Sequence, residues 1–383
     1  MRIDLPGFGP YELREPVSWP AVDRPASSRI VYAAAHVVAD PLGDNTPGSP
    51  AAVDWDATLR FRRHLWSLGL RVADAMDTAQ RNMGLDWAAT RELIRRSAAE
   101  ARSFGDPATL VSCGAGTDHA PDAADLNTIT AAYAEQIEAV QSAGAGVIVM
   151  ASRQLARVAA GPKDYHQVYG KLFGLAERPV ILHWLGEMFD PNLAGYWGSP
   201  DVAAATESFL ELIHANAAMV DGVKVSLLDE EHEIGLRAAL PEGVKLYTGD
   251  DFNYPSLIRS GSHALLGIFD AIAPAAAAAL QALDAAEAGD EQALARYDEI
   301  LAPTVPLSRK IFERPTYNYK TGIVFLAWLN GHQDAFAMVN GAQSARSLVH
   351  LAEVFRLADQ AGLLADQELA VRRMKALLAV NGL

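Results

Sequence analysis

Short apolar runs alternate with longer stretches of mixed apolar and polar residues along most of the chain. Most of the short runs are continuously hydrophobic instead of alternating apolar with polar positions. Continuous runs are typical of strands that are covered on both faces in a parallel sheet. Eight such runs predict strands, at residues 30–38, 68–74, 109–113, 146–151, 180–185, 219–225, 244–248 and 264–269.

The segments between these runs have the spacing of amphipathic helices. Asp86 and Asp125 precede two of them and are predicted N-caps. Pro200 and Pro274 suit the first turn of two others. The predicted helices span residues 87–103, 125–142, 163–177, 201–216, 230–239, 254–260 and 274–288.

The regular alternation predicts an α/β fold, a closed (β/α)8 TIM barrel with additional C-terminal helices. Eight strand–helix units fit within the roughly 250 residues that such barrels use. A doubly wound open sheet is the alternative. Its dinucleotide-binding version is disfavoured because no GxGxxG motif follows the first strand.

Three parts make up the predicted domain organisation. Residues 1–28 are Pro-rich and predict an arm packed across the barrel, which itself covers residues 29–300. Residues 301–383 predict a helical extension, packed on the barrel or forming an interface, with helices near 320–330, 344–360 and 365–380. A long loop at 41–58 follows the first strand, on the face where barrel enzymes carry out their chemistry.

Composition and net charge disfavour several classes of function. The chain has 47 acidic and 32 basic residues, a net charge of −15, which disfavours binding to duplex nucleic acid. Its single cysteine, Cys113, excludes an internal disulfide and fits a reducing cytoplasm. No signal-peptide pattern opens the chain, and no apolar run reaches the length of about 18 residues that a membrane helix needs. We therefore expect a cytoplasmic protein that acts on a small molecule, without nucleic-acid or membrane partners.

Lys224 is the most informative candidate for chemistry. It lies in a predicted strand between Val223 and Val225, so strand alternation directs its side chain into the barrel if the valines face the helices. A buried amine there must either find a carboxylate or lose its proton. A lysine with a lowered pKa can attack a carbonyl and form a Schiff base. A structural salt bridge to Asp250 is the alternative.

At these positions the chain resembles the dihydrodipicolinate synthase/N-acetylneuraminate lyase family, from about residue 30 to 331. The motifs that carry the resemblance are GAGT at 114–117, PVILHW at 179–184, DGVKVS at 221–226, TGDD at 248–251 and the lysine of YNYKTGIVFL, Lys320. The resemblance implies a TIM barrel and class I lyase chemistry in which Lys224 forms the imine. It implies no cofactor beyond that lysine, and a homodimer or homotetramer.

Several departures from the family change the expected substrate. The proton-relaying tyrosine of the fifth strand is His183 here. A histidine with a pKa near neutral could do the same work, or be a hydrogen-bonded core residue. The family's GTTGE motif aligns with MDTAQ at 76–80, where Thr78 remains and Asp77 replaces the other threonine. A carboxylate there opposes a substrate carboxylate by about 1–4 kcal/mol. The arginine of some members aligns near Met188.

The predicted mouth is rich in acids, which accept hydrogen bonds from hydroxyl groups or hold a divalent cation. This favours a hydroxylated, sugar-derived carbonyl compound. The acids are Asp118, Glu187, Asp190, Asp229, Asp250 and Asp251, of which Asp190 and Asp229 also suit helix N-caps. The predicted catalytic residues are Lys224 and His183, and the predicted substrate-binding residues are Asp77, Thr78, Gln80, Thr117, Glu187, Ser226, Asp250 and Asp251.

Three functions follow from these residues. The first is a Schiff-base aldolase, lyase or dehydratase, with Lys224 forming the iminium and His183 relaying protons. The second is a metal-dependent sugar isomerase, epimerase or class II aldolase, although no HxH or HExxH spacing supports it. Its candidate ligands are His36, Asp77, His119, Glu187, Asp229 and His232. The third is a barrel that binds a metabolite without turnover.

Overall fold

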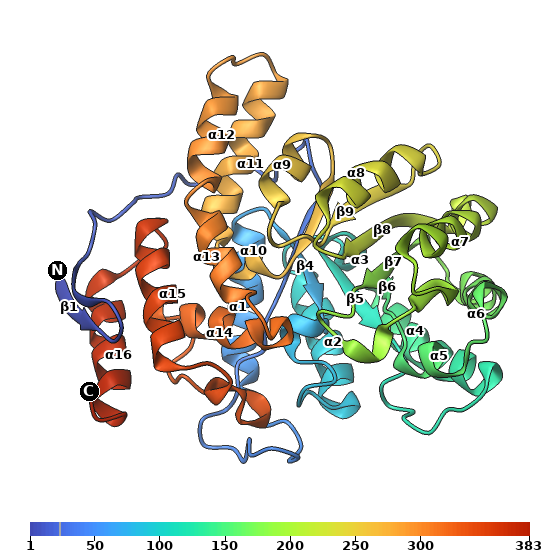
Figure 1. The fold of residues 1–383 in the computed structure, drawn as a ribbon, viewed down its shortest axis with the longest axis horizontal. Helices are drawn as coiled ribbons and strands as arrows, with labels where there is room; N and C mark the ends of the chain where they lie inside the picture. The colour runs from blue at the N-terminus through green and yellow to red at the C-terminus, as the bar shows by residue number, and fades with distance from the viewer. Residues whose placement is uncertain (23) are drawn as a thin grey trace.

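Eight parallel strands close into a barrel in the computed structural model, which describes residues 1–22 and 24–383 (Figure 1). The strands follow one another around the ring in chain order, and the last pairs with the first. Each of the eight predicted runs overlaps one of them, so the TIM barrel is confirmed. The strands are β3 (Val31–Ala34), β4 (Arg71–Asp74), β5 (Val111–Ala115), β6 (Gly146–Val149), β7 (Val180–Leu185), β8 (Val220–Ser226), β9 (Lys245–Thr248) and β10 (His263–Leu266).

Strand alternation divides the barrel's apolar residues into two cores. One face of each strand packs under the surrounding helices in a large outer core. The other face points inward and forms a small separate core, made of Tyr32, Ala34, Ala73, Met76, Ile148, Met150, Ile181, Tyr247 and Leu265. On β7 the residue two positions beyond Ile181, on the same face and nearer the carboxyl end, is His183. The inner core therefore forms an apolar floor below the polar residues of the barrel mouth.

Helices cover the outside of the barrel, and the predicted N-caps Asp86 and Asp125 accept backbone hydrogen bonds at the starts of α2 and α4. The predicted 41–58 loop is shorter than expected, because Asp54 caps a helix that begins at Trp55. The helices are α1 (Trp55–Ser67), α2 (Trp87–Ala101), α3 (Pro107–Leu110), α4 (Leu126–Ala143), α5 (Arg153–Val158), α6 (Pro162–Leu175), α7 (Val202–Ala215), α8 (Glu230–Ala239), α9 (Tyr254–Arg259), α10 (Ile268–Ala271) and α11 (Ala273–Glu287).

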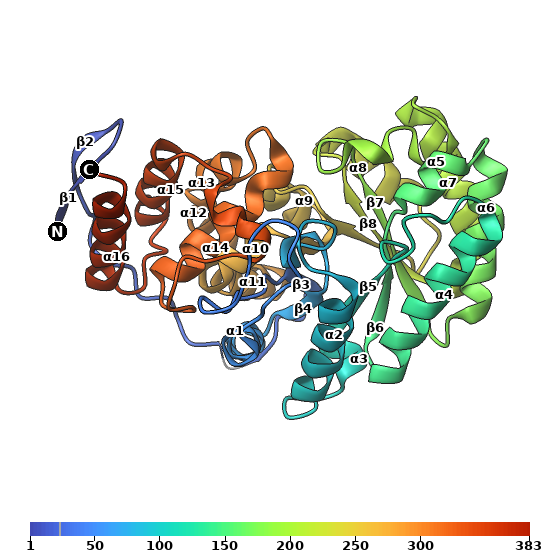
Figure 2. The same cartoon turned by 90° about the horizontal axis from the view of Figure 1, so that it is seen from below.

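A layer of C-terminal helices stands beside the barrel (Figures 1 and 2). It consists of α12 (Ala293–Leu301), α13 (Thr304–Ile311), α14 (Tyr319–Leu329), α15 (Leu348–Gln360) and α16 (Gln367–Val380). The last three match predicted helices, whereas α12 and α13 were not predicted. Every residue of α14 is buried, because α10 of the barrel and α13, α15 and α16 of the layer all pack against it. This helix joins the layer to the barrel.

Short 3-10 helices occupy several of the connections. They are η1 (Asp77–Ala79), η2 (Pro191–Leu193), η3 (Tyr196–Gly198), η4 (Ala217–Met219), η5 (Thr316–Asn318) and η6 (Val339–Ser344). The first of them, η1, directly follows β4 at the barrel mouth and carries two of the predicted site residues, Asp77 and Thr78.

The N-terminal arm differs from the expectation that it would cross the barrel. It begins with a hairpin of β1 (Arg2–Leu5) and β2 (Gly9–Glu12), which lies beside the C-terminal layer (Figure 2). Tyr11 Oη donates to a carboxylate oxygen of Asp359 on α15 at 2.6 Å. The end of the arm meets α11 of the barrel, where Ser27 N and Ser28 N each donate to Asp284 at 2.8 Å and Gln281 Nε2 donates to the Arg24 carbonyl at 3.0 Å. Its hydrogen bonds therefore tie it both to the C-terminal layer and to this barrel helix.

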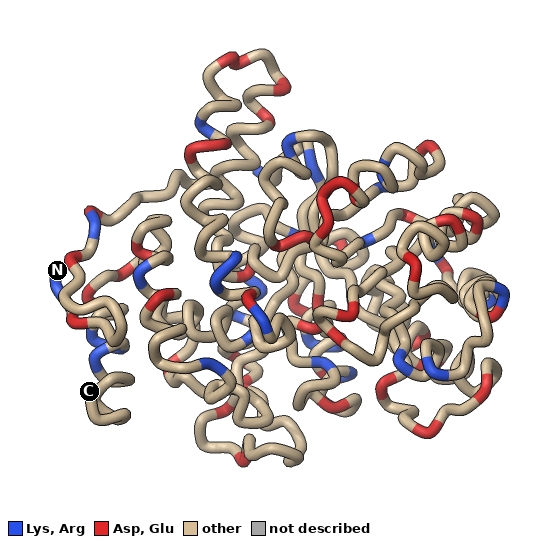
Figure 3. Tube along the Cα trace, viewed as in Figure 1, with Lys and Arg blue, Asp and Glu red and all other residues tan. Residues whose placement is uncertain are grey.

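Acidic and basic residues are interspersed over the tube in Figure 3, without a continuous basic stripe on the face shown. Among residues 1–22 and 24–383, no helix combines the length and the apolar character needed to span a bilayer.

Candidate active site

Lys224 points into the barrel from β8. Its neighbours Val223 and Val225 belong to the outer core, so the lysine between them takes the inward face. Its Cα is in register with His183 of β7 and Tyr247 of β9, and the side chain is only 7% exposed. A side chain at Gly249 would collide with Ser226 and lie 3.0 Å from Lys224 Cε, so a glycine there is what lets the end of β9 approach the lysine.

The Lys224 amine is buried without a direct partner. Burial lowers the pKa of Lys224, and the nearby carboxylates of Asp77 and Asp251 offset this only partly. Among the described residues, its amine makes neither a hydrogen bond nor an ion pair. The alternative salt bridge to Asp250 is not formed, because the Asp250 carboxylate accepts hydrogen bonds from Phe252 N and from Asn253. The amine is therefore available to react with a carbonyl.

His183 lies beside Lys224 and is fully buried. Its Nε2 is 3.4 Å from Ser226 Oγ, while Nδ1 has no hydrogen-bond partner within the described part of the chain. Burial, together with the neighbouring Lys224 charge, holds the pKa of His183 well below its usual value. The expectation of a histidine that titrates near neutral pH is therefore wrong, since this imidazole stays neutral there.

A small cavity of about 20 Å³ opens at the carboxyl ends of β4 to β7. Three predicted site residues line it: Asp77, Thr117 and His183. Its other lining residues are Asn82, Gly116, Asp118, Met150, Ala151, Arg153, Gln154, Leu185, Asp190 and Leu193. Lys224 itself does not line the cavity, but two of its neighbours do: Asp77, whose charge acts on the amine, and His183, which is in register with it.

Asp77 faces a second buried lysine, Lys320 at the start of α14. Lys320 is 5% exposed, and its Nζ donates to the Tyr317 carbonyl at 3.1 Å. Burial lowers the pKa of Lys320 to about 8, against the attraction of Asp77 and Asp190. The Asp77 carboxylate caps no backbone N–H of η1. One carboxylate therefore lies between two buried amines without binding either directly.

Thr78 is held by the C-terminal layer. Its Oγ1 shares a hydrogen bond of 2.8 Å with Tyr319 Oη, and both side chains are buried. The Tyr319 ring stacks on Phe312 with the centroids 4.3 Å apart. The C-terminal helices therefore contribute Tyr319 and Lys320 to this end of the barrel, and sequence reasoning missed Tyr319.

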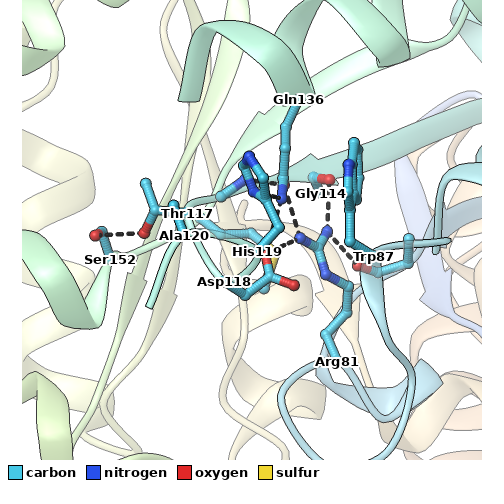
Figure 4. Close-up of polar contacts among 12 residues, drawn as sticks. Arg81, Trp87, Gly114, Thr117, Asp118, His119, Ala120, Gln136 and Ser152 are labelled. Atoms are coloured by element: carbon cyan, nitrogen blue, oxygen red, sulfur yellow. Dashed lines mark hydrogen bonds and ion pairs between the residues drawn. The ribbon is translucent and has the colours of Figure 1, made fainter. Parts of the chain in front are cut away.

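One wall of the cavity is built on Arg81, whose guanidinium is buried (Figure 4). It donates to the carbonyl of Gly114 at 2.8 Å, to Gln136 Oε1 at 2.7 Å and to Asp118. Gln136 Nε2 also donates to Asp118 at 3.0 Å, and Gly116 N donates to Gln136 Oε1 at 2.6 Å. We call Arg81, Gly114, Gly116, Asp118 and Gln136 the wall cluster. It fixes the loop after β5 to the loop after β4.

Thr117 continues this wall toward β6. Its hydroxyl lies 2.7 Å from Ser152 Oγ and donates to Gln154 Oε1 at 2.7 Å. Ser152 N in turn donates to Tyr196 Oη at 3.0 Å. The hydroxyl of Thr117 is therefore oriented by a network rather than free to rotate.

Fewer acids at the barrel mouth are free to bind a ligand than the sequence indicated, because most of the carboxylates have partners inside the protein. Asp118 bonds to the wall cluster, and Asp190 binds Arg153 Nε at 2.5 Å. Asp251 accepts from Ile268 N at 2.8 Å, and burial raises the pKa of Asp251 to about 7. Asp190 and Asp229 cap η2 and α8, as the alternative interpretation held. Among the described residues, Asp77 and Glu187 are the acids without such a partner, and only Asp77 lines this cavity.

Of the eight predicted substrate-binding residues, Asp77 and Thr117 line this cavity and six do not; two of the six, Glu187 and Gln80, lie on loops that lead away from it. Glu187 lines a separate pocket of about 210 Å³, together with Trp184 and Asp229. Gln80 is buried, and its amide donates to the Val339 carbonyl at 3.0 Å, which ties the loop after β4 to η6. These two corrections follow from the loops after β4 and β7, whose paths strand periodicity does not determine.

The metal-ligand set of the alternative function is dispersed. His36 bonds to Asp270, with Nδ1 and Oδ2 2.7 Å apart, and His119 bonds to Gln136. His232 bonds to Thr206 on a neighbouring helix. Among the described residues, no three histidine, cysteine or acidic side chains gather in a way that could hold a metal ion.

A buried acid behind β9 was also missed by sequence reasoning. Glu233 of α8 accepts from Thr248 Oγ1 at 2.8 Å, and burial raises the pKa of Glu233 to about 8. Asp250 N donates to the same Thr248 oxygen at 3.1 Å, so Glu233 supports the turn at the carboxyl end of β9. No sequence signal separates it from the exposed acids around it.

A comparison with known sequence families accounts for nearly the whole chain. Residues 6–383 match the family described as "Protein of unknown function (DUF993)". The chain belongs to the DUF993 family. No curated protein matches this DUF993 sequence.

Solved structures similar to this DUF993 protein share its fold at low sequence identity. Dihydrodipicolinate synthase from Aquifex aeolicus is 12% identical, with a TM-score of 0.65, over 88% of this chain and 99% of that one. The 4-hydroxy-tetrahydrodipicolinate synthase from Methylacidiphilum fumariolicum SolV is 13% identical, with a TM-score of 0.65, over 91% and 99%. Dihydrodipicolinate synthase from Acinetobacter baumannii, complexed with pyruvate, is 16% identical, with a TM-score of 0.61, over 88% and 100%. The resemblance drawn from motif order is thus confirmed for the fold.

Proposed function

We propose that this DUF993 protein is a class I lyase, an aldolase or dehydratase, that forms a Schiff base between Lys224 and a small carbonyl substrate. The observation that carries the proposal is the buried Lys224 amine, which has no hydrogen bond or ion pair among the described residues. A lowered pKa leaves a larger fraction of the amine unprotonated and nucleophilic. Strongly perturbed groups at the end of a cavity are typical of active sites. The likeness to dihydrodipicolinate synthase structures supports the same chemistry.

The chemistry begins with attack of Lys224 Nζ on the carbonyl carbon, which gives a carbinolamine. Loss of water, which carries away the former carbonyl oxygen, then leaves the iminium. His183 and Ser226 serve this step, because neutral His183 Nε2 lies beside Ser226 Oγ and next to Lys224. The proton released by the attacking nitrogen passes through Ser226 and neutral His183 to the former carbonyl oxygen in one relay, which leaves no lasting imidazolium. A second proton, taken up from solvent, lets that oxygen leave as water.

The substrate we propose is a hydroxylated, sugar-derived carbonyl compound, without a carboxylate next to the reacting carbon. Asp77 lines the cavity and opposes a second carboxylate at close range. Thr117, Asn82 and Gln154 line the same cavity and offer neutral hydrogen-bonding groups to hydroxyls. A barrel of this kind needs no bound cofactor, since the lysine imine is the electron sink.

The expected homodimer or homotetramer stays a prediction. One similar structure is described as a monomeric dihydrodipicolinate synthase variant, so the fold is compatible with more than one assembly. Light scattering on the purified protein measures the molar mass, and 41.1 kDa corresponds to a single chain.

Reductive trapping tests the Schiff base. The protein is incubated with hydroxyacetone or with pyruvate, reduced with borohydride, and digested for mass spectrometry. We expect a covalent adduct on Lys224, formed more readily with hydroxyacetone than with pyruvate. Lys224→Met removes the adduct, whereas Lys163→Met, which changes an exposed lysine outside the cavity, retains it.

Two results contradict the proposal. The absence of an adduct on Lys224 with either probe would remove the Schiff-base chemistry. An adduct formed faster with pyruvate would keep the chemistry but reject the substrate class. An adduct on Lys320 as well as on Lys224 would contradict the assignment of the Schiff base to Lys224 alone.

A further inference from the structure

Among the described carboxylates that line the cavity, Asp77 differs from Asp118 and Asp190 in having no hydrogen-bond or ion-pair partner. Asp118 and Asp190 are bonded to arginines, and Asp250 and Asp251 accept backbone N–H groups. The Asp77 carboxylate makes no such contact among the described residues, although it lines the cavity. An ionised group is rarely left unbonded in a partly buried position without a functional reason.

Asp77 lies near both buried amines at this end of the barrel. It is the carboxylate with the largest attraction for the Lys224 amine and also for the Lys320 amine. Neither amine touches it, so a small molecule can lie between the carboxylate and Lys224. Asp77 and His183 line the same cavity from β4 and β7, that is, from different sides of the ring.

The iminium requires a base that His183 does not readily supply. Once the imine has formed, the bond to a proton on the adjacent carbon must be broken for an enamine to form. His183 can pass a proton on in the relay of imine formation, but it is fully buried and its Nδ1 has no partner among the described residues, so an imidazolium that had to hold a proton through this second step would not be stabilised. Asp251, the other acid near Lys224, is buried and bonded to Ile268 N. Asp77 is left as the accessible carboxylate.

We propose that Asp77 is a further catalytic residue, the base that takes the proton from the carbon adjacent to the Lys224 imine. This inference rests on the proposed Schiff-base function and adds a proton acceptor to it. The C–H bond breaks, its proton goes to a carboxylate oxygen of Asp77, and its electron pair forms the new C=C bond. The C=N electron pair moves to the Lys224 nitrogen, which becomes the neutral enamine nitrogen. Return of the proton from Asp77 reverses the step.

Exchange of carbon-bound protons tests this role separately from imine formation. The protein is incubated with hydroxyacetone in D2O, and loss of the signals of the protons next to the carbonyl is followed by NMR. We expect Lys224-dependent exchange in the wild type. Asp77→Asn should lower the exchange rate by about 10²–10⁴-fold, the range for loss of a general base. The borohydride adduct on Lys224 should stay within about twofold of the wild-type amount, since the amine is untouched.

Matched variants keep the test decisive. Asp122→Asn, which neutralises an exposed carboxylate outside the cavity, should leave exchange and trapping unchanged. Asp77→Ala with added formate should recover part of the exchange, because the free carboxylate can occupy the vacated space. Asp77→Glu keeps the charge and serves if the asparagine variant does not fold; we expect slowed exchange with trapping intact.

The outcomes separate this inference from the proposed function. No adduct on Lys224 in the wild type contradicts the Schiff base itself. An intact adduct together with wild-type exchange in Asp77→Asn overturns the role of Asp77 and leaves the Schiff base standing. Loss of the adduct in a folded Asp77→Asn protein also overturns it, because Asp77 would then be needed for imine formation.

Discussion

Two groups of buried charges lie at the same end of the barrel, and they are built in opposite ways. In the wall cluster, the Arg81 guanidinium bonds to two carbonyls, an amide and the Asp118 carboxylate. In the other group, which we call the amine centre, Lys224 and Lys320 face Asp77 without contact. Bonded charges stabilise a fold, whereas buried charges left apart oppose folding. The difference indicates which group serves structure and which serves chemistry.

Of the substitutions that test this difference, removal of Arg81 should change the free energy of unfolding most. Arg81→Met leaves Asp118 and two carbonyl groups without their donor in the interior. Loss of one partner of a buried charge pair costs about 3–5 kcal/mol. We expect the free energy of unfolding, measured by urea denaturation, to fall by that amount. A change below about 1 kcal/mol would show that the wall cluster is not a structural element.

The amine centre should respond in the opposite direction. Lys320→Met removes a buried amine whose pKa is lowered to about 8, and it should raise the free energy of unfolding by about 1–3 kcal/mol at neutral pH. Because the unfolded chain binds more protons between pH 8 and 10.5, the wild type gains stability across that window. The advantage of the variant is therefore full below pH 8 and fades toward pH 10.5. Urea titrations at pH 7 and 10 measure it.

Lys224→Met tests both stability and chemistry at a single residue. Because the Lys224 amine has a lowered pKa and no bonded partner, we expect the variant to be at least as stable as the wild type while borohydride trapping is lost. The stability gain should again shrink as pH rises toward 10.5. Thermal unfolding and trapping on the same preparation report both properties. A variant that is strongly destabilised would instead make Lys224 a structural residue.

Thr117→Val probes the edge of the wall and should have the smallest effect. The substitution keeps the shape of the side chain but removes a hydroxyl that bonds to Gln154 and Ser152. Loss of such a hydrogen bond costs about 1 kcal/mol. Urea denaturation should detect this loss, and trapping on Lys224 should persist because the amine lies outside this network.

The sequence predicted the barrel well, because strand and helix periodicities are local signals. Runs such as 146–151 and 180–185 are buried on both faces and cannot be amphipathic helices. Strand alternation around Val223 and Val225 also directed Lys224 inward. Asp125 was recognisable as a helix start, since a capping side chain precedes its helix by one position.

The failures lie where the outcome depends on contacts between distant segments. Gln80 was predicted to touch substrate, but it bonds to Val339, 259 positions away. Arg81, the residue that follows it, carries the wall cluster although no motif marks it. The pKa of His183 depends on complete burial beside Lys224, which composition and spacing do not reveal. Periodicity fixes where a strand ends and leaves open the path of the loop beyond it.

The buried helix α14 has a consequence for how such proteins can be rebuilt. It brings Tyr319 and Lys320 from the C-terminal layer to the mouth of the barrel. A chimera that joined this barrel to another tail would lose the hydrogen bond of Tyr319 to Thr78 and the amine of Lys320 near Asp77. The barrel and its tail therefore have to be exchanged together if the surroundings of Asp77 and Thr78 are to be kept.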